Sequence, residues 1–185
     1  MRKMTFVLAA LAANLGTATT IAWAADPAPA TAKEVVLKVH EAVQYLNEKG
    51  LAGFSDFNNN KDARWVWKDS YVFVYSCRED VMIAHPLRPD LVGKPILRMR
   101  DDKDQPLFQH LCQASANQDG GWVEYWWPKP GEAKASRKIS YTQSAAVSFK
   151  SDIRVGAGIY DDQLTPADLS NILEESTQKS PKAVP

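Results

Sequence analysis

Gly120-Gly121-Trp122-Val123-Glu124-Tyr125-Trp126-Trp127-Pro128-Lys129-Pro130 is the stretch of sequence that decides the predicted fold. It holds three of the six tryptophans of this 185-residue chain and ends in a proline-rich stop. Aromatic residues favour strands, and alternation along a strand places Val123, Tyr125 and Trp127 on one face. Trp122, Glu124 and Trp126 then lie on the other face. A strand with large rings on both faces can pack one side into a core and line a pocket with the other.

The segments on both sides of this strand predict a five-stranded antiparallel sheet. Downstream, strands at 137–149 and 153–160 are joined by a turn at 150–152 and complete a three-strand meander. Upstream, strands at 71–75 and 81–85 form a hairpin around the turn at 78–80.

Helices are predicted before the hairpin, between hairpin and meander, and at the end of the chain. A capping box, Thr31-x-x-Glu34, opens a long helix whose apolar residues recur at helical spacing and which ends at Lys49-Gly50. Shorter helices are expected at 51–57, 106–116 and 166–175. This order predicts an α+β fold with the helices on one side of the sheet.

The first 24 residues have the pattern of a secretory signal peptide. Arg2 and Lys3 precede an apolar run at 6–13, and Ala22-Trp23-Ala24 supplies a cleavage pattern. The run is shorter than the roughly 20 apolar residues of a membrane helix, and an uncleaved anchor is the alternative. We expect an exported protein, periplasmic or secreted. Its predicted organisation is a signal peptide at 1–24, a mobile lead at 25–30, one domain at 31–162, and a short helix with a polar tail at 163–185.

The charge balance does not indicate a nucleic-acid or anionic-membrane surface. The chain has 22 basic and 22 acidic residues, and removal of the signal leaves 20 basic against 22 acidic. Nucleic acids and anionic lipids require a concentrated basic patch, so neither partner is expected.

Cys77 and Cys112 are the two cysteines, and in an oxidising compartment a lone pair forms a disulfide by default. Such a bridge would stabilise the fold by roughly 3–4 kcal/mol. Two buried free thiols, or a metal site using His85 or His110, are the alternatives. The acidic run at 101–104 lacks the spacing of a calcium loop, and capping of the following helix explains it better. Neither a metal nor a cofactor is expected.

Several short sequence motifs occur together in a characteristic order. They are 71–75 followed by Ala84-His85-Pro86 and 91–94, Asp104-x-x-x-Phe108, the aromatic stretch 120–130, Lys138-Ile139-Ser140-Tyr141, and 156–160. In this order they resemble a single-Cache domain, an extracytoplasmic PAS-like sensing module of bacterial chemoreceptors and sensor kinases. The resemblance covers residues 31–162, and the hairpin turn departs from the family's usual glycine at 78–80.

The resemblance implies a PAS-like five-stranded antiparallel sheet with a long N-terminal helix and a helix inserted between hairpin and meander. It also implies a pocket on the concave face of the sheet for a small molecule, often a short carboxylate. Family members usually sit between two membrane helices. Because a second such helix is not found in the sequence, we expect this chain to report ligand occupancy to a separate membrane partner.

A carboxylate pocket needs a cation or several donors in a partly apolar cavity. Lys138 matches the lysine of the family's Lys-x-x-Tyr phrase and is the predicted cation, with a solvated strand lysine as the alternative. His85 could donate to an anion and would titrate near neutral pH. The predicted ligand-binding residues, each of which could instead serve the core or a loop, are Lys138, His85, Tyr125, Trp127, Tyr71, Phe73, Tyr141 and Arg64. Tyr141 shares a face with Lys138 only if the strand bulges.

Two other functions stay open. One is a carbohydrate-binding module that stacks sugars on Trp122, Trp126 and Trp127, and the other is a structural or assembly domain without a ligand. The sequence carries no Gly-x-Ser-x-Gly elbow, phosphate loop or His-Glu-x-x-His motif, so an enzyme is not expected.

Overall fold

A computed structural model describes residues 28–147 and 150–171 of the chain. The predicted signal peptide at 1–24 lies outside the described residues. The first part of the lead at 25–30 also lies outside them, as do the end of the predicted helix at 166–175 and the polar tail. No helix among the described residues is long and apolar enough to cross a membrane.

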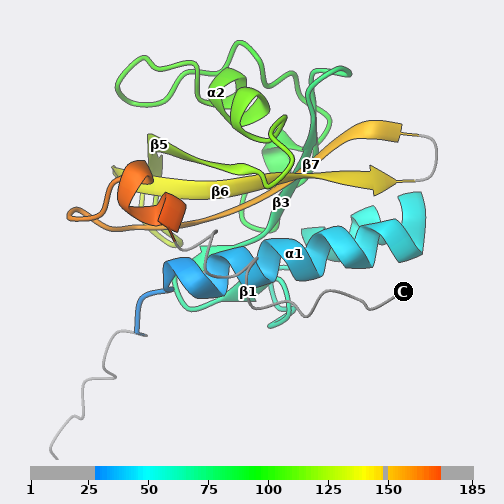
Figure 1. Cartoon of the computed structure of the whole chain (residues 1–185), viewed down its shortest axis with the longest axis horizontal. Helices are drawn as coiled ribbons and strands as arrows, with labels where there is room; N and C mark the ends of the chain where they lie inside the picture. The colour runs from blue at the N-terminus through cyan, green and yellow to red at the C-terminus, as the bar shows by residue number, and fades with distance from the viewer. Residues whose placement is uncertain (1–27, 148–149, 172–185) are drawn as a thin grey trace, which may run out of the picture.

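A five-stranded antiparallel sheet forms the centre of the molecule (Figure 1). Its strands are β3 (Phe73–Ser76), β4 (Val81–Ala84), β5 (Gly121–Pro128), β6 (Ala135–Val147) and β7 (Lys150–Ile159). The spatial order is β4-β3-β7-β6-β5, so the hairpin joins the meander through the pairing of β3 with β7. The predicted hairpin, meander and strand number are confirmed. The predicted turn at 150–152 is wrong, because β7 already begins at Lys150.

The predicted strand at 71–75 is divided into two strands that belong to different sheets. Ser70–Tyr71 (β2) pairs with Val66–Trp67 (β1) in a separate two-stranded sheet, which the sequence did not predict. Val72 separates β2 from β3, because its backbone N–H donates to the carbonyl of Trp65 at 2.9 Å rather than to the main ladder.

The long N-terminal helix, α1 (Ala32–Lys49), begins and ends as predicted. The Thr31 hydroxyl accepts from the Glu34 backbone N–H at 3.3 Å, and the Glu34 carboxylate accepts from the Thr31 N–H at 2.8 Å. Gly50 closes the helix with φ of 64°, a conformation that glycine adopts readily. The buried residues Val35, Val36, Val39, Ala42 and Leu46 form the apolar stripe. The segment after α1 is a 3₁₀ helix, η1 (Gly50–Asn58).

The helices lie on both faces of the sheet, which corrects the expectation that they share one side. Helix α1 packs on β6 and β7, whereas α2 (Leu107–Ala114) covers the opposite face next to β5 (Figure 1). The physical reason is visible in β5. Trp122 belongs to the core on the α1 side, whereas Val123 and Tyr125 belong to the core on the α2 side. Because both faces are apolar, each needs a cover.

A long loop, which contains the short 3₁₀ helix η2 (Pro89–Leu91), crosses the α2 face between β4 and α2. Asp101 fixes the end of this loop. One carboxylate oxygen accepts from the backbone N–H groups of Lys103 and Gln105, at 2.9 and 2.8 Å. The other oxygen accepts from the Trp126 N–H at 2.9 Å. The acidic run therefore ties the loop to β5.

Cys77 and Cys112 form the predicted disulfide, with their Cα atoms 5.9 Å apart. The bridge joins the turn after β3 to α2. It therefore attaches the cover of this face to the sheet.

Candidate functional site

The α2 face of the sheet holds a buried lysine surrounded by aromatic rings. Lys138 lies on β6 directly opposite Tyr125 of β5, and its side chain is 0% exposed. Its Nζ lies 4.0 Å from the ring centre of Tyr71, 5.2 Å from Tyr160 and 5.6 Å from Phe73. These rings come from β2, β3 and the end of β7, so three separate segments enclose the amine.

The Lys138 ammonium has no hydrogen-bond partner among the described residues. Burial lowers the pKa of Lys138 to about 7, and the carboxylate of Asp69 opposes this shift. A buried charge without a partner is costly, and ring faces replace only part of the lost hydration. The group therefore sits between its charged and neutral forms near neutral pH.

Gly158 of β7 makes the space that this lysine occupies. A Cβ at this position would lie 2.7 Å from Lys138 Cε and 2.9 Å from the Ile139 carbonyl oxygen, and would overlap the Ser140 hydroxyl. The Ile139 carbonyl is backbone of a central strand and cannot easily move aside.

Gly158→Ala should therefore destabilise the fold by about 1–3 kcal/mol, the usual range for overpacking a core, and displace Lys138. Denaturant unfolding measures the effect. Gly53→Ala is the matched control, because its nearest contacts are side-chain atoms at 3.1 Å or more. Equal stability of Gly158→Ala and the wild-type protein would contradict the close packing described above.

Two tyrosine hydroxyls on this face are hydrogen-bonded to neighbouring side-chain hydroxyls. The Tyr125 hydroxyl lies 2.8 Å from Ser140 Oγ, and the Tyr75 hydroxyl lies 2.7 Å from Thr142 Oγ1. Burial raises the pKa of both tyrosines, so they are neutral hydroxyls that can donate or accept. Among these buried groups Lys138 is the one whose hydrogen-bonding capacity is unused.

His85 closes the far side of the ring cluster. Its ring centre lies 4.8 Å from Tyr71 and 6.3 Å from Trp127. Nδ1 accepts from the backbone N–H groups of Leu87 and Arg88, at 3.3 and 3.0 Å, so the proton of the neutral ring is on Nε2. Burial, reinforced by the positive charges of Lys138 and Arg88, lowers the pKa of His85 to about 3. The expected titration near neutral pH is therefore wrong, although the ring still offers one N–H donor.

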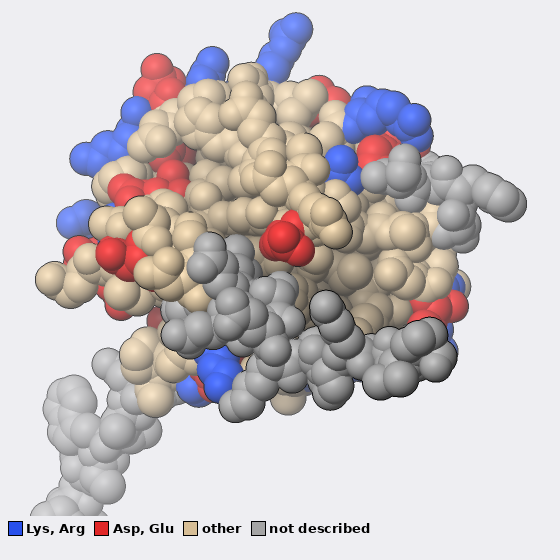
Figure 2. Space-filling view, in the orientation of Figure 1, with Lys and Arg blue, Asp and Glu red and all other residues tan. Residues whose placement is uncertain are grey.

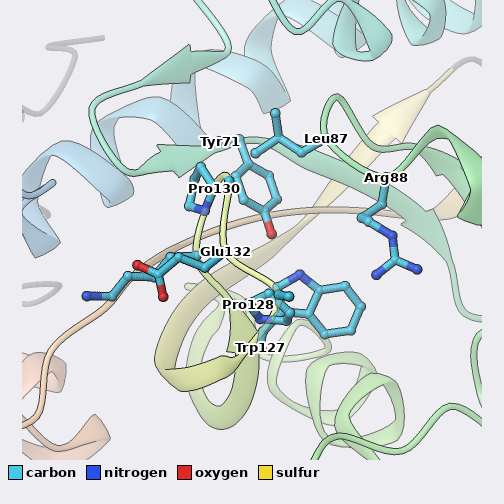
Figure 3. A pocket seen from close by; sticks show the side chains of 10 residues that line it. Tyr71, Leu87, Arg88, Trp127, Pro128, Pro130 and Glu132 are labelled. Atoms are coloured by element: carbon cyan, nitrogen blue, oxygen red, sulfur yellow. The ribbon is translucent and has the colours of Figure 1, made fainter.

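Tyr71 and Trp127 of the cluster line two neighbouring hollows. An inner crevice of about 10 Å³ is lined by Tyr71, Phe73, His85, Leu107, Phe108, Tyr125 and Trp127. An outer cavity of about 230 Å³ lies between the 87–88 loop and the 127–133 segment (Figure 3). The inner crevice has room for about one water molecule.

Six of the eight predicted ligand-binding residues meet at this cluster: Lys138, His85, Tyr125, Trp127, Tyr71 and Phe73. Their ligand-binding role stays a prediction. Tyr141 and Arg64 do not meet them. Strand β6 runs without a bulge from 138 to 141, so Tyr141 faces α1, where its hydroxyl lies 3.2 Å from His40 Nε2. Arg64 lies over the rings of Tyr45 and Trp65 and pairs with Glu41 at 2.7 Å.

The structure also contradicts the tryptophan platform for sugars. Trp122 is buried on the α1 side against Tyr141, whereas Trp127 lines the crevice on the other face. Trp126 lies under the Lys103 ammonium, at 5.3 Å. Strand alternation places Trp127 on the opposite face from Trp122 and Trp126, so the three rings cannot form one coplanar surface.

Sequence reasoning missed Tyr160, Ser140, Arg88 and the two crevice residues of α2, Leu107 and Phe108. Side chains two residues apart on a strand point to the same face. This alternation could have identified Ser140, two residues after Lys138, and Tyr160, two residues after Gly158. No sequence pattern near Arg88 indicates its role, because its place beside Trp127 depends on how the loop folds back.

The face of the molecule seen in Figure 2 has mixed charge. Figure 2 shows basic and acidic groups interspersed around the edge of the visible face, with a mostly uncharged middle. The described part of this face therefore presents no large patch of a single sign.

Comparison with known proteins identifies the family. The sequence pattern of the Cache domain (dCache_2) matches residues 57–175, which is more than half of the chain. The chain belongs to the Cache domain family. The resemblance to a Cache domain is thus confirmed, and the α+β architecture agrees with that of Cache sensor domains of known structure.

This Cache domain is similar to sensory proteins of bacterial chemotaxis. It is 34% identical over 84 residues to the methyl-accepting chemotaxis protein McpP of Pseudomonas putida, covering 45% of this chain and 15% of that protein. The chain thus spans a small part of the length of that relative.

Three solved structures share the fold. A periplasmic sensor domain of a chemotaxis protein is 27% identical, with a TM-score of 0.53, covering 69% of this chain and 93% of that one. A methyl-accepting chemotaxis protein from Vibrio parahaemolyticus is 25% identical, with a TM-score of 0.53, covering 70% and 88%. A Cache chemosensory domain described for carboxylic acid recognition is 24% identical, with a TM-score of 0.51, covering 68% and 92%.

These relatives are sensor domains of chemoreceptors, and no enzyme family is indicated. They support ligand sensing as the general role of this Cache domain and an extracytoplasmic location for it.

Proposed function

We propose that this Cache domain senses a short carboxylate, which binds in the ring cluster with its anionic group against Lys138. The observation that carries the proposal is the buried Lys138 ammonium, for which the described part of the chain offers no hydrogen-bond partner. A carboxylate placed there would turn an uncompensated buried charge into an ion pair with hydrogen bonds, which is strong in a water-poor site.

The surrounding groups suit a small organic anion. The hydroxyls of Tyr71 and Tyr125 and the Nε2–H of His85 are neutral donors, and the remaining walls are apolar rings. Because the inner crevice is almost filled, a ligand has to displace side chains to enter. Short carbon chains require the smallest displacement, and so they are favoured.

The partner and the location are also part of this proposal. The similarity to a chemoreceptor supports a role in which ligand occupancy is reported to a separate membrane sensor. Export to the periplasm by the signal peptide at 1–24, followed by folding of a domain at 31–162, would place the site where such a sensor meets its ligand. The 24%-identical structure described for carboxylic acid recognition shows the fold alone and does not identify the ligand of this chain.

A thermal-shift screen of residues 25–185 against carboxylates, amino acids, amines and sugars tests the function. A ligand at about 100 times its Kd stabilises the folded state by roughly 2.7 kcal/mol, which moves the melting temperature by several degrees. We expect shifts from short carboxylates and none from neutral sugars. A cooperative melt without a shift from any compound would overturn the proposal and favour an assembly domain without a ligand.

Carboxylate affinity should fall as the pH rises above neutrality. The free protein has a Lys138 pKa of about 7, and a bound carboxylate raises it, so binding takes up a proton above that pH. Affinity should be nearly constant between about pH 5 and pH 7 and then drop by up to about tenfold per pH unit. Calorimetry in buffers of different ionisation enthalpy measures the proton uptake. Constant affinity up to about pH 9 without proton uptake would exclude a titrating Lys138 from the site.

A further inference from the structure

The outer cavity and the inner crevice are separated by a wall of two side chains. Tyr71 and Trp127 are the two residues that line both hollows. The outer cavity opens toward solvent between the 87–88 loop and the 127–133 segment, whereas Lys138 lies behind Tyr71. In Figure 3 the hydroxyl of Tyr71 points toward the indole of Trp127. A molecule that reaches the crevice from the outer cavity has to pass this wall.

Tyr71 is the fixed half of the wall. Its side chain is 2% exposed, its ring lies over the Lys138 ammonium, and its backbone pairs with Val66 in the small sheet. Turning its buried ring aside would uncover the Lys138 ammonium and lose this packing.

Trp127 is the half that can move. Its backbone pairs with Ser136 of β6, and the next residue is fixed because the Pro128 carbonyl accepts from the Tyr160 hydroxyl at 2.6 Å. The indole is only partly buried, however, and its outer side faces the Arg88 guanidinium at 5.7 Å. Rotation about the side-chain bonds would open the crevice without disturbing the sheet.

Arg88 holds the indole in the closed position. Its backbone N–H donates to His85 Nδ1 at 3.0 Å, and its guanidinium pairs with Asp90 at 2.7 Å. A cation over an indole contributes a weak attraction at an exposed site, so the closed position is favoured but not locked.

We propose that the indole of Trp127 is the gate of the sensing site. It turns away from Tyr71 to admit ligands from the outer cavity, and its closed position limits the length of the ligand that fits. This inference rests on the proposed function for the identity of the ligand, but the gate itself can be tested without any ligand.

Acylation of Lys138 reports how often the gate opens. At about pH 8 most of the Lys138 amine is neutral and would react with acetic anhydride that reaches it, since its pKa is about 7. The reaction forms an amide at Nζ and releases acetate, and mass spectrometry of the Lys138 peptide gives the rate. Exposed lysines such as Lys103 serve as internal references. A bulkier N-hydroxysuccinimide ester tests the size limit.

Trp127→Ala should raise the Lys138 labelling rate by about tenfold or more, because a minor open state is typically populated at 0.1–10%. The gain should be larger for the bulky reagent. Arg88→Ala, which removes no core side chain, should give a smaller increase in the same direction. Trp126→Ala is the matched control, because it deletes a neighbouring indole that lies outside both hollows.

Labelling that is no faster in Trp127→Ala and Arg88→Ala than in Trp126→Ala would overturn the gate. Equal acceleration in all three variants would also overturn it, because the reagent would then enter through unfolding. The proposed function is tested separately by measuring Lys138 labelling of the wild-type protein with and without a short carboxylate such as propionate. Protection of Lys138 supports that function. Faster labelling in Trp127→Ala without protection by any carboxylate would support the gate proposal and contradict the proposal that the ligand is a carboxylate.

Discussion

Lys138→Met is expected to lower carboxylate affinity by at least about 30-fold while leaving the fold intact, because truncating one partner of a buried charge pair costs about 2–5 kcal/mol. Methionine has a similar length and fills the space between Tyr71, Phe73 and Tyr160. It carries no charge that has to be buried, so the free protein should melt at the same or a higher temperature. Loss of binding together with unchanged or greater stability is the combination expected of a functional lysine.

Isothermal titration calorimetry and thermal melts of the same samples measure the two effects. Lys103→Met is the matched control, because Lys103 is an exposed lysine that also lies against a tryptophan ring, but outside the crevice. A Lys138→Met protein that binds as tightly as the wild-type protein would remove Lys138 from the site. A protein that unfolds would show that the lysine serves the structure.

The pH dependence of stability adds an independent check on Lys138. Its pKa is about 7 in the folded protein and is ordinary in the unfolded chain, so the unfolded state binds more protons between these values. Wild-type stability therefore gains a contribution from Lys138 as the pH rises from about 7 to about 10. Lys138→Met lacks this contribution, so its advantage over the wild-type protein should shrink across that range.

Removal of the Cys77–Cys112 bridge is expected to lower the free energy of unfolding by roughly 3–4 kcal/mol, because the bridge restricts the unfolded chain over 35 residues. The crevice should loosen as well, since Leu107 and Phe108 of α2 line it and Cys112 anchors the same helix. The double variant Cys77→Ser, Cys112→Ser avoids an unpaired thiol. Denaturant unfolding and amide exchange of α2 report the two effects.

The wild-type protein under reducing conditions is the control, and it should unfold at the same denaturant concentration as the double serine variant. A loss of less than about 1 kcal/mol would show that the packing of Leu107, Phe108 and Leu111 holds α2 without the bridge. Unchanged exchange of the α2 amides would contradict the role of the bridge in holding the cover of the site.

Much of the fold could be predicted because its signals are local. The capping box at Thr31 and Glu34 fixes the start of α1, since both hydrogen bonds lie within three residues. The two faces of β5 follow from the two-residue period of a strand. The same period shows that Lys138 and Tyr141 point to opposite faces unless β6 bulges, and β6 does not bulge there.

Other features could not be predicted from any short stretch of the sequence. The break at Val72 depends on a hydrogen bond to Trp65, and the placement of helices on both faces depends on how two apolar surfaces are covered at once. The suppressed titration of His85 depends on burial under a loop and on positive charges from Lys138 and Arg88. The location of Arg64 follows from α1, which provides the carboxylate of Glu41.

The sequence by itself determined which side chains share a face, where the long helix begins, and that a lysine follows the aromatic strand. Backbone geometry sets these features within a few residues. Only the tertiary structure decided that Lys138 is enclosed by Tyr71, Phe73 and Tyr160, with Gly158 leaving it room. That enclosure requires β7 to lie between β3 and β6. This strand order comes from burying both faces of the whole sheet, a property of the complete chain that no single segment carries.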